Sequence, residues 1–555
     1  MTCYPAWAAE VVWYEIFPDR FCRKNFNNPL SAEDLLGTTP WNFDGQEWKI
    51  SAWDAEWKGR QAHEKNNRKS LKMNVLRRRY GGDLEGVISK LDYLAGLGIT
   101  ALYFTPLQFS PSLHKYDGTN FLHIDPFFGS NALDDKRIIL EENFLDFENA
   151  KWTSADLLAL EMIKKAHSLG MKVIFDGVFN HIGYNSVPFQ DVLQNREKSR
   201  FKDWFLIDFE KSTKKTLVYE KFWGCVKEMP KLNYACKEVK QYVFAVLKRW
   251  LKPIVEGTEK EGIDGWRIDH AIGVPMMFWK QANAFVKSIK NDALFLGELI
   301  EPNEVIKPYL DEKCFDSVMN YGFYFAAAEF FAAEDNSISA LQFDKKLRSQ
   351  LKLFNSGSNF LAMNLLDTHD TERFSSLVVN GRLKKFGSIA EFFENTHSGD
   401  KKYSTRQPKD LERKIQKMAV VFEFSSVGSP MVFYGDELGM WGANDPDCRK
   451  PMAWENGDEE MLKFYKKIIA FRNANKSVFS FGQFVTHYAD SKKRVYVYSR
   501  KKGDEEIFFA FNRETVPETV EIEVSGCRKQ ITLDKLSFTI IKSANGVEEF
   551  VPDIS

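Results

Sequence analysis

The sequence predicts an α/β protein built on a (β/α)8 TIM barrel, with an excursion domain after strand 3 and a C-terminal antiparallel β-domain. Eight short apolar segments alternate with helix-like segments before residue 477, which is typical of a barrel of parallel strands. Polar residues cluster at the ends of several of these segments. From residue 478 the pattern changes to alternating strands. We therefore expect a catalytic barrel over residues 1–182 and 235–477, an excursion domain over 183–234 and a β-domain over 478–555.

Each barrel strand is expected from a short apolar run bounded by glycine, proline or polar residues. The expected strands cover residues 11–18, 99–105, 172–178, 265–268, 294–297, 315–319, 360–366 and 430–434. The spacing of apolar residues predicts helices before four of them, at residues 83–97, 154–169, 239–251 and 275–290. In such a barrel the working groups gather at the carboxyl ends of the strands.

Two regions depart from a plain barrel. Residues 183–234 are far longer than a usual loop after a strand, which indicates a separate excursion. Residues 494–498, 506–511 and 520–524 alternate or run apolar between turn residues, so they are expected to form antiparallel strands.

Composition excludes several classes of function. The net charge of −1 gives no general attraction to nucleic acid or to anionic membranes. The chain has no run of about 18 apolar residues, so no membrane span is expected, and its first residues do not resemble a secretory leader. Its seven cysteines are scattered, odd in number and without a C-x-x-C pair, which indicates reduced thiols and a cytoplasmic location.

Polar and charged residues mark the ends of four expected strands, where barrel enzymes keep their catalytic groups. They are Asp176, Asn180 and His181 at the third strand, Arg267, Asp269 and His270 at the fourth, Glu298 at the fifth, and His369 and Asp370 at the seventh. The sequence has no glycine-rich phosphate loop after the last strands and no zinc-spaced His/Cys set. These residues therefore predict acid–base and nucleophilic catalysis on a neutral polar substrate.

Glycoside hydrolysis suits such a set, because it needs two carboxyl groups with different pKa values. Arg267 and Asp269 lie two apart on a strand and share a face, so the guanidinium should keep the pKa of this carboxyl low, as a nucleophile requires. Glu298, between Leu296 and Leu299, should keep its proton in a less polar setting and donate it to the leaving oxygen. An isolated Arg-x-Asp pair is more often structural, and it is the other polar clusters that favour catalysis.

The remaining members of the cluster would bind the sugar. A third carboxylate can hold sugar hydroxyls and stabilise positive charge in the transition state. His181 and His369 would hydrogen-bond hydroxyl groups, and an aromatic ring such as that of Tyr116 would stack on the sugar ring.

Four stretches resemble the signature regions of the α-amylase family of glycoside hydrolases. They are Asp176-Gly-Val-Phe-Asn-His181, Gly265-Trp-Arg-Ile-Asp269, Gly297-Glu298 and Thr368-His-Asp370. Met229-Pro-Lys-Leu-Asn233 is similar to the excursion-domain signature of the neopullulanase, cyclomaltodextrinase and maltogenic amylase branch. The resemblance covers nearly the whole chain.

This resemblance implies a retaining α-glucan hydrolase that cuts α-1,4 bonds of malto-oligosaccharides and starch-type glucans by double displacement. It makes Asp269 the nucleophile, Glu298 the general acid/base and Asp370 the transition-state stabiliser, which agrees with the roles argued from the residues. The implied substrate-binding residues are Arg267, which also positions Asp269, and His181, His369, Tyr116, Asp117, Asp176, Asn180 and His270.

The chain also departs from that branch. Its members usually carry an extra β-domain before the barrel, whereas the first expected strand begins here at residue 11. We therefore expect that domain to be absent and the protein to be a monomer rather than a homodimer. Ile300 stands where the family has tryptophan, and Ile272-Gly273 replaces an Asn-Glu pair. Together with His270 these positions line the leaving-group side, so a preference for cyclodextrin or pullulan does not carry over.

No cofactor is expected to be required. The region that can bind calcium in the family reads Arg23-Lys-Asn-Phe-Asn-Asn-Pro29 and lacks the carboxylates that calcium prefers. Asn25, Asn28 and Asp83 are the weak calcium candidates that remain.

Two other functions use the same fold. An α-glucan transglycosylase would employ the same three carboxylates, with a sugar acceptor in place of water. A non-catalytic barrel that binds sugar or a partner protein would need a broken catalytic set, whereas Asp269, Glu298 and Asp370 are all present. Glucan length, tolerance of α-1,6 branches, and endo or exo action stay open at this level.

Overall fold

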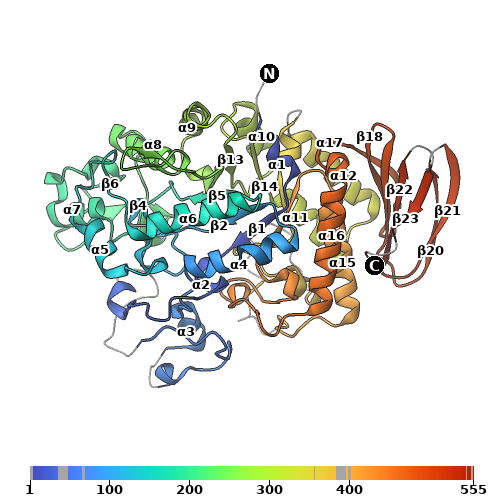
Figure 1. The fold of residues 1–555 in the computed structure, drawn as a ribbon, viewed down its shortest axis with the longest axis horizontal. Helices are drawn as coiled ribbons and strands as arrows, with labels where there is room; N and C mark the ends of the chain where they lie inside the picture. Colours follow the sequence, from blue (N-terminus) through green and yellow to red (C-terminus); the bar gives the residue numbers. More distant parts are fainter. Residues whose placement is uncertain are drawn as a thin grey trace.

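A computed structural model of the chain describes residues 4–35, 48–65, 69–354, 357–382, 396–397, 402–524, 526–544, 547–551 and 554. A closed barrel of eight parallel strands forms its centre, which confirms the expected fold class (Figure 1). The barrel strands are β1 (Trp13–Ile16), β2 (Ala101–Phe104), β5 (Lys172–Gly177), β12 (Gly265–Ile268), β13 (Leu294–Gly297), β14 (Ser317–Asn320), β15 (Met363–Leu365) and β16 (Ser429–Phe433). Each of them overlaps an expected segment.

The barrel closes because the last strand pairs with the first. Trp13 of β1 lies opposite Met431 of β16 on one side and opposite Ala101 of β2 on the other. All residues of β1, β2, β12 and β13 are buried, as in parallel sheets that are covered on both faces. Gly265 opens β12 because a Cβ atom there would lie 2.2 Å from the backbone oxygen of Leu294 on β13.

Helices surround the barrel and begin where the sequence supplies caps. The Asp83 side chain accepts a hydrogen bond from Gly86 N at the start of α4, which ends before Gly98 at a φ of 93°. Thr153 and Asp156 form a capping box at α6. The longer helices are α4 (Leu84–Leu97), α6 (Ser154–Ser168), α8 (Lys237–Leu251), α9 (Met276–Ile289), α12 (Ala340–Leu353), α15 (Asp410–Ser425) and α16 (Glu459–Ala474). Shorter ones are α1 (Trp7–Glu10), α2 (Pro18–Phe21), α3 (Leu71–Arg77), α5 (Ala132–Glu141), α7 (Val187–Asn195), α10 (Asn303–Asp311), α11 (Tyr321–Ala327), α13 (Phe374–Val379) and α17 (Lys476–Phe481).

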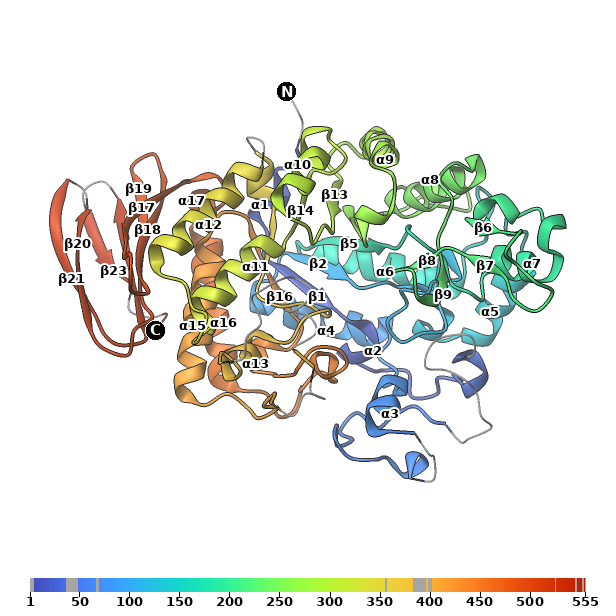
Figure 2. The ribbon, with the colours of Figure 1, turned by 180° about the vertical axis from the view of Figure 1, so that it is seen from behind.

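Small antiparallel hairpins lie in the loops between the barrel elements. Two of them follow β5, and the isolated bridge between His181 and Lys231 ties the base of this excursion to the end of β5. In Figure 2 the excursion lies at the end of the molecule opposite the C-terminal sheets. The hairpin strands are β3 (Gln108–Phe109), β4 (Asn120–Ile124), β6 (Ile207–Asp208), β7 (Val218–Tyr219), β8 (Lys221–Phe222), β9 (Val226–Pro230), β10 (Ile254–Val255) and β11 (Thr258–Glu259).

The C-terminal region is antiparallel, as expected, and forms a five-stranded and a two-stranded sheet. Its strands are β17 (Gln483–Ala489), β18 (Val495–Lys502), β19 (Glu505–Asn512), β20 (Glu518–Val524), β21 (Cys527–Leu533), β22 (Ser537–Ala544) and β23 (Val547–Phe550). Aromatic packing joins it to the barrel, since Tyr498 and Phe511 both contact Phe422 of α15.

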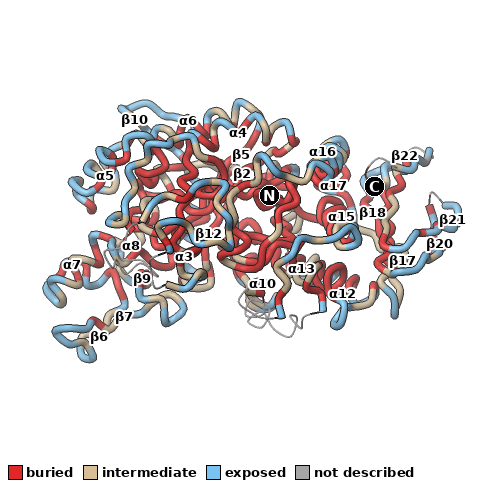
Figure 3. The backbone as a smooth tube through the Cα atoms, turned by 90° about the horizontal axis from the view of Figure 1, so that it is seen from below, coloured by how far each residue is buried: buried red, intermediate tan, exposed pale blue. Residues whose placement is uncertain are grey.

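Burial follows this architecture. Buried backbone runs through the barrel, whereas the outer turns are exposed (Figure 3). Within the described residues, no helix has the length and apolar character that crossing a bilayer requires.

Candidate active site

One guanidinium gathers three carboxylates at the carboxyl ends of β5, β12 and β13. Arg267 lies opposite Asp176 in the parallel register of β12 and β5. Its Nη1 donates to both oxygens of Asp176 at 2.8 Å and to Oδ1 of Asp269 at 3.1 Å. Its Nη2 forms an ion pair with Oε1 of Glu298. The structure thus brings these four expected site residues into direct contact.

The electrostatics of Asp269 differ from the expectation. Burial raises the pKa of this carboxyl well above its usual range; Arg267 opposes the shift, and the charges of Glu298 and Asp176 add to it. Arg267 is shared by three carboxylates and does not outweigh burial, which differs from the expectation that it would keep the pKa of Asp269 low.

Glu298 also lies in a more polar setting than expected. Leu296 and Leu299 are buried beside it, yet its Oε2 accepts a hydrogen bond from the backbone N of His270 at 2.9 Å. Its Oε1 contacts Arg267 and accepts from the Tyr321 hydroxyl at 3.4 Å. By contrast, the buried Oδ2 of Asp269 has no hydrogen-bond partner among the described residues. Of the two carboxyls, Asp269 therefore keeps an oxygen that accepts no hydrogen bond from the described residues.

A second charged group forms around His369. Its Nδ1 contacts the carboxylate of Glu15 in β1, and its Nε2 lies 3.1 Å from Oδ2 of Asp370. Burial disfavours the charged imidazole, but the carboxylates of Asp370 and Glu15 outweigh burial and raise the pKa of His369 to about 10. His369 is therefore an imidazolium at neutral pH.

Asp370 is correspondingly held as an anion. Its Oδ1 accepts from Nη2 of Arg449 at 3.0 Å, and Arg449 also donates to the backbone oxygen of His369 at 2.7 Å. Burial opposes ionisation, but His369 and Arg449 hold the pKa of this carboxyl below its usual range. Its side chain is 36% exposed, so this anion can still reach a ligand.

Tyr116 connects the two charged groups. Its hydroxyl donates to Oδ2 of Asp176 at 3.0 Å and lies 2.5 Å from Nε2 of His369. Its ring stacks on that of His369 with centroids 5.5 Å apart, and on that of His114 at 5.8 Å. The ring is thereby fixed at the edge of the carboxylate cluster.

The remaining expected residues lie beneath or beside this cluster. Burial lowers the pKa of His181 to about 4, and its neutral ring contacts the backbone oxygen of Tyr116 at 2.8 Å. Asn180 Nδ2 lies 3.2 Å from His181 Nδ1. Asp117 accepts from the Ser110 hydroxyl at 2.6 Å. His270 has φ of 41° and packs edge-on against Phe222, which also contacts His181.

Several residues at the site were not among the expected ones. They are Glu15, Tyr103, Tyr321, Phe222 and Arg449, and Tyr103 donates to Oδ2 of Asp176 at 2.8 Å. Glu15 carried a signal in the sequence, because it is the one charged residue in the buried run Trp13–Ile16. The others come from distant segments whose contacts only the folded chain creates.

The weak calcium candidates all accept hydrogen bonds from backbone N–H groups. The side-chain oxygens of Asn25 and Asn28 accept from the backbone N of Asn27 and Leu30. Both oxygens of Asp83 accept from backbone N–H groups of Gly86, Lys24 and Asn25. In the part of the chain that the structure describes, no three or more His, Cys, Asp or Glu residues are grouped as a metal site requires.

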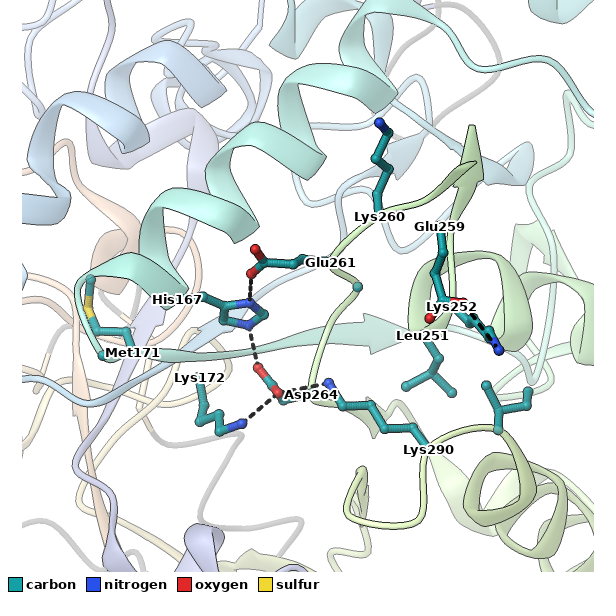
Figure 4. Close-up of a pocket in the computed structure, with 13 residues that line it drawn as sticks. His167, Met171, Lys172, Leu251, Lys252, Glu259, Lys260, Glu261, Asp264 and Lys290 are labelled. Carbon is teal, nitrogen blue, oxygen red and sulfur yellow. Dashed lines mark hydrogen bonds and ion pairs between the residues drawn. The ribbon is translucent and has the colours of Figure 1, made fainter. Parts of the chain in front are cut away.

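A cavity of about 810 Å³ lies at the amino ends of the barrel strands, away from this cluster (Figure 4). Asp264, just before β12, accepts there from His167, Lys172 and Lys290 at 2.7 to 2.9 Å. A second cavity of about 430 Å³ adjoins the carboxylate cluster and is lined by Asn180, His270 and the tip of the β8–β9 hairpin. Of these two cavities, the second lies nearer to the carboxyl ends of the strands, where the active sites of such barrels are found.

Known proteins resemble this chain over most of its length. Residues 15–143 and 152–401 match the family model described as alpha amylase, catalytic domain. Neopullulanase 2 of Thermoactinomyces vulgaris is 35% identical over 96% of this chain and 74% of its own length. The intracellular maltogenic amylase of Bacillus subtilis is 31% identical over 93% of this chain and 71% of its own. A solved structure of a cyclomaltodextrinase has a TM-score of 0.72 at 28% identity and covers 98% of this chain and 79% of that one.

Proposed function

Because this chain belongs to the α-amylase family and is a glycoside hydrolase, we propose that it is a retaining α-glucan hydrolase acting on the α-1,4 bonds of malto-oligosaccharides and starch-type glucans. One observation carries this proposal: Arg267 binds both Asp269 and Glu298, while Oδ2 of Asp269 has no hydrogen-bond partner among the described residues. Two close carboxyls, one of them with an uncommitted oxygen, supply a nucleophile and a proton donor. The names of the three relatives support an α-glucan as substrate.

In the first step, Oδ2 of Asp269 attacks the anomeric carbon as Glu298 donates its proton to the glycosidic oxygen. The carbon–oxygen bond to the leaving sugar breaks, and a covalent glycosyl ester forms on Asp269. In this step Asp269 acts as the carboxylate and Glu298 as the carboxylic acid.

In the second step, Glu298 removes a proton from a water molecule whose oxygen attacks the same carbon, and the ester bond to Asp269 breaks. Two displacements return the original anomeric configuration. Asp370, held ionised by His369 and Arg449, stabilises positive charge on the sugar ring.

Asp176 acts as a positioning residue in this scheme. Both of its oxygens accept from Arg267, and one also accepts from the hydroxyls of Tyr103 and Tyr116. It therefore fixes the guanidinium that orients Asp269 and Glu298. Tyr116, His181, Asp117, Asn180, His369 and His270 would shape the pocket for the sugar of the cleaved bond and its neighbour.

The wider assignments are part of the same proposal. Residues 1–182 and 235–477 form the catalytic domain, residues 183–234 the excursion domain and residues 478–555 the C-terminal domain. The enzyme is a monomer that needs no cofactor and works in the cytoplasm. Six unpaired cysteines among the described residues and the intracellular relative support this location.

Product analysis tests the proposal. Wild type and Asp269→Asn are incubated with maltotriose, maltoheptaose, cyclodextrin, pullulan and starch, and the anomer is followed by NMR. We expect cleavage of linear malto-oligosaccharides with retention, and a loss of at least about 10³-fold in the variant. Asp134→Asn, an exposed change on α5, is the matched control. Inverted product would refute double displacement. Dominant transfer products at high maltotriose would favour the transglycosylase instead.

A further inference from the structure

The tip of the β8–β9 hairpin carries a tryptophan in an unfavourable backbone conformation. Trp223 and Gly224 have φ of 50° and 70°, and the backbone oxygen of Phe222 accepts from Cys225 N at 3.2 Å. Such turns favour asparagine, aspartate or glycine at the first central position, and a bulky residue with positive φ is uncommon. Backbone strain of this kind concentrates at functional sites, so the choice of tryptophan calls for an explanation.

The indole is exposed and stacked. Trp223 is 73% exposed, and its ring lies on that of Phe222 with centroids 4.5 Å apart and planes at 23°. Phe222 in turn contacts the ring of His270 at 4.9 Å, and the backbone N of His270 donates to Glu298. One exposed apolar residue is ordinary on a protein surface. Trp223, however, is connected to Glu298 through only two residues, Phe222 and His270.

The indole also borders the cavity of about 430 Å³ beside the carboxylate cluster. Asn180 lines the same cavity and is 1% exposed, and its Oδ1 has no hydrogen-bond partner within the described residues. Lys221 and Lys231 also line the cavity, so two ammonium donors lie in the same lining as the Trp223 ring. A concave site with one flat ring and a few polar groups suits a sugar, which has apolar faces and a rim of hydroxyls.

The position of the cavity fixes which sugar it would hold. His270 lines the cavity, and its backbone N donates to Glu298, the residue that protonates the leaving oxygen in the proposed mechanism. The cavity therefore belongs to the leaving-group side.

We propose that Trp223 is a stacking platform for a glucose unit on the leaving-group side, beyond the sugar directly attached to the cleaved bond. This inference rests on the proposed function and deepens it. Tryptophan offers a large rigid surface with few torsions to order, so stacking there selects substrates long enough to reach it. Trp223 would accordingly set the preference for longer malto-oligosaccharides and would hold an acceptor sugar in the same place.

The chain supplies a matched control for this residue. The β10–β11 hairpin has the same turn, with Glu256 and Gly257 at φ of 49° and 74°, and neither residue lines the cavity. Trp223→Gly and Glu256→Gly each relieve the same backbone strain, so neither is expected to lower the thermal midpoint.

The test compares kcat/KM for maltoheptaose with that for α-maltosyl fluoride, whose leaving group is too small to reach the platform. In Trp223→Gly we expect about a tenfold loss with maltoheptaose, the size of one aromatic stacking contact, and no change with the fluoride. Trp223→Phe should recover most of the loss, and Glu256→Gly should behave as wild type.

Other outcomes overturn the inference separately from the proposed function. If Trp223→Gly cuts maltoheptaose as wild type does, the indole is no platform. If activity on both substrates falls equally, Trp223 only supports the fold of the site. If wild type turns over neither substrate, the proposed function itself fails.

Discussion

At Arg267 one planar guanidinium faces the carboxylates of Asp176, Asp269 and Glu298, and the chemistry of the site follows from this sharing. A planar fork can contact several acceptors at once, which a lysine ammonium of the same charge cannot do with fixed geometry. The second charge centre, His369 after β15, contacts Glu15 of β1, and only β16 separates these two strands. Residues of the first and seventh barrel strands thus meet through one ion pair.

This ion pair gives a prediction for the pH dependence of activity. Glu15→Gln removes one of the two carboxylates that raise the pKa of His369 to about 10, so the imidazolium should lose its charge at lower pH. We expect the alkaline limb of the kcat/KM profile to move down by about one pH unit, with little change near pH 6. The profile is measured from pH 6 to pH 10 with maltoheptaose. An unshifted alkaline limb would show that the charge of His369 does not control activity.

At the scale of single elements, β12 is anchored at both ends by charge. Its carboxyl end carries Arg267 and Asp269, and Asp264 precedes its amino end. Asp264 accepts from His167, Lys172 and Lys290, which come from α6, β5 and the end of α9 (Figure 4). His167 bridges Asp264 and Glu261 through its two ring nitrogens, both at 2.7 Å. Since both acceptors are carboxylates, the bridge is complete only when the imidazole carries both protons.

The bridge predicts a pH-dependent contribution to stability. Burial opposes the charge on His167, but Asp264 and Glu261 outweigh it and raise the pKa of this imidazole. Because the pKa is higher in the folded state, protonated His167 stabilises the fold, and this contribution is complete below the unfolded pKa of about 6.5. It disappears as the pH rises through the pKa of the folded state. The side chain is 20% exposed, so we expect only about 1 kcal/mol.

Chemical unfolding of wild type and His167→Gln at pH 5.5 and pH 9.5 measures this contribution. The variant should be less stable at pH 5.5 and should approach wild type at pH 9.5. An equal deficit at both values would mean that His167 contributes through packing and neutral hydrogen bonds alone.

On the scale of the whole molecule, the barrel, the excursion and the C-terminal sheets are joined by protein contacts. Aromatic rings connect the C-terminal sheet to α15, and the bridge from His181 to Lys231 connects the excursion to β5. The side-chain oxygens of Asn25, Asn28 and Asp83 are occupied by backbone N–H groups. Protein hydrogen bonds therefore hold the loop after β1, where a family member can use calcium.

We accordingly expect chelation with EDTA to leave the thermal midpoint and the activity unchanged within error. Added calcium should likewise raise neither of them. A thermal midpoint that falls by several degrees with EDTA and returns with calcium would show that this enzyme holds a structural cation. The loop after β1 would then have to adopt other contacts than the hydrogen bonds described above.

Much of the fold was predictable because its signals are local. The strands β12 and β13 begin and end at the expected residues, because each is a short apolar run bounded by glycines and charged residues, which is too short for a buried helix. The spacing of apolar residues placed the starts of α4 and α6 to within one residue, and Asp83 and Thr153 cap these helices in the structure. Elements of two residues, such as β8 and β10, were not predicted, because a hairpin that short depends on its turn and its neighbours.

The sequence by itself determined the barrel, its family and the residues at the ends of the barrel strands, because periodicity and motifs lie in consecutive residues. Only the tertiary structure decided how these residues interact. It gave Arg267 three carboxylates instead of one, placed Glu298 among polar groups, and brought Glu15, Arg449 and Trp223 to the site from segments far apart in the chain. The physical reason is that charge, burial and stacking depend on distances through space, which spacing along a sequence does not contain.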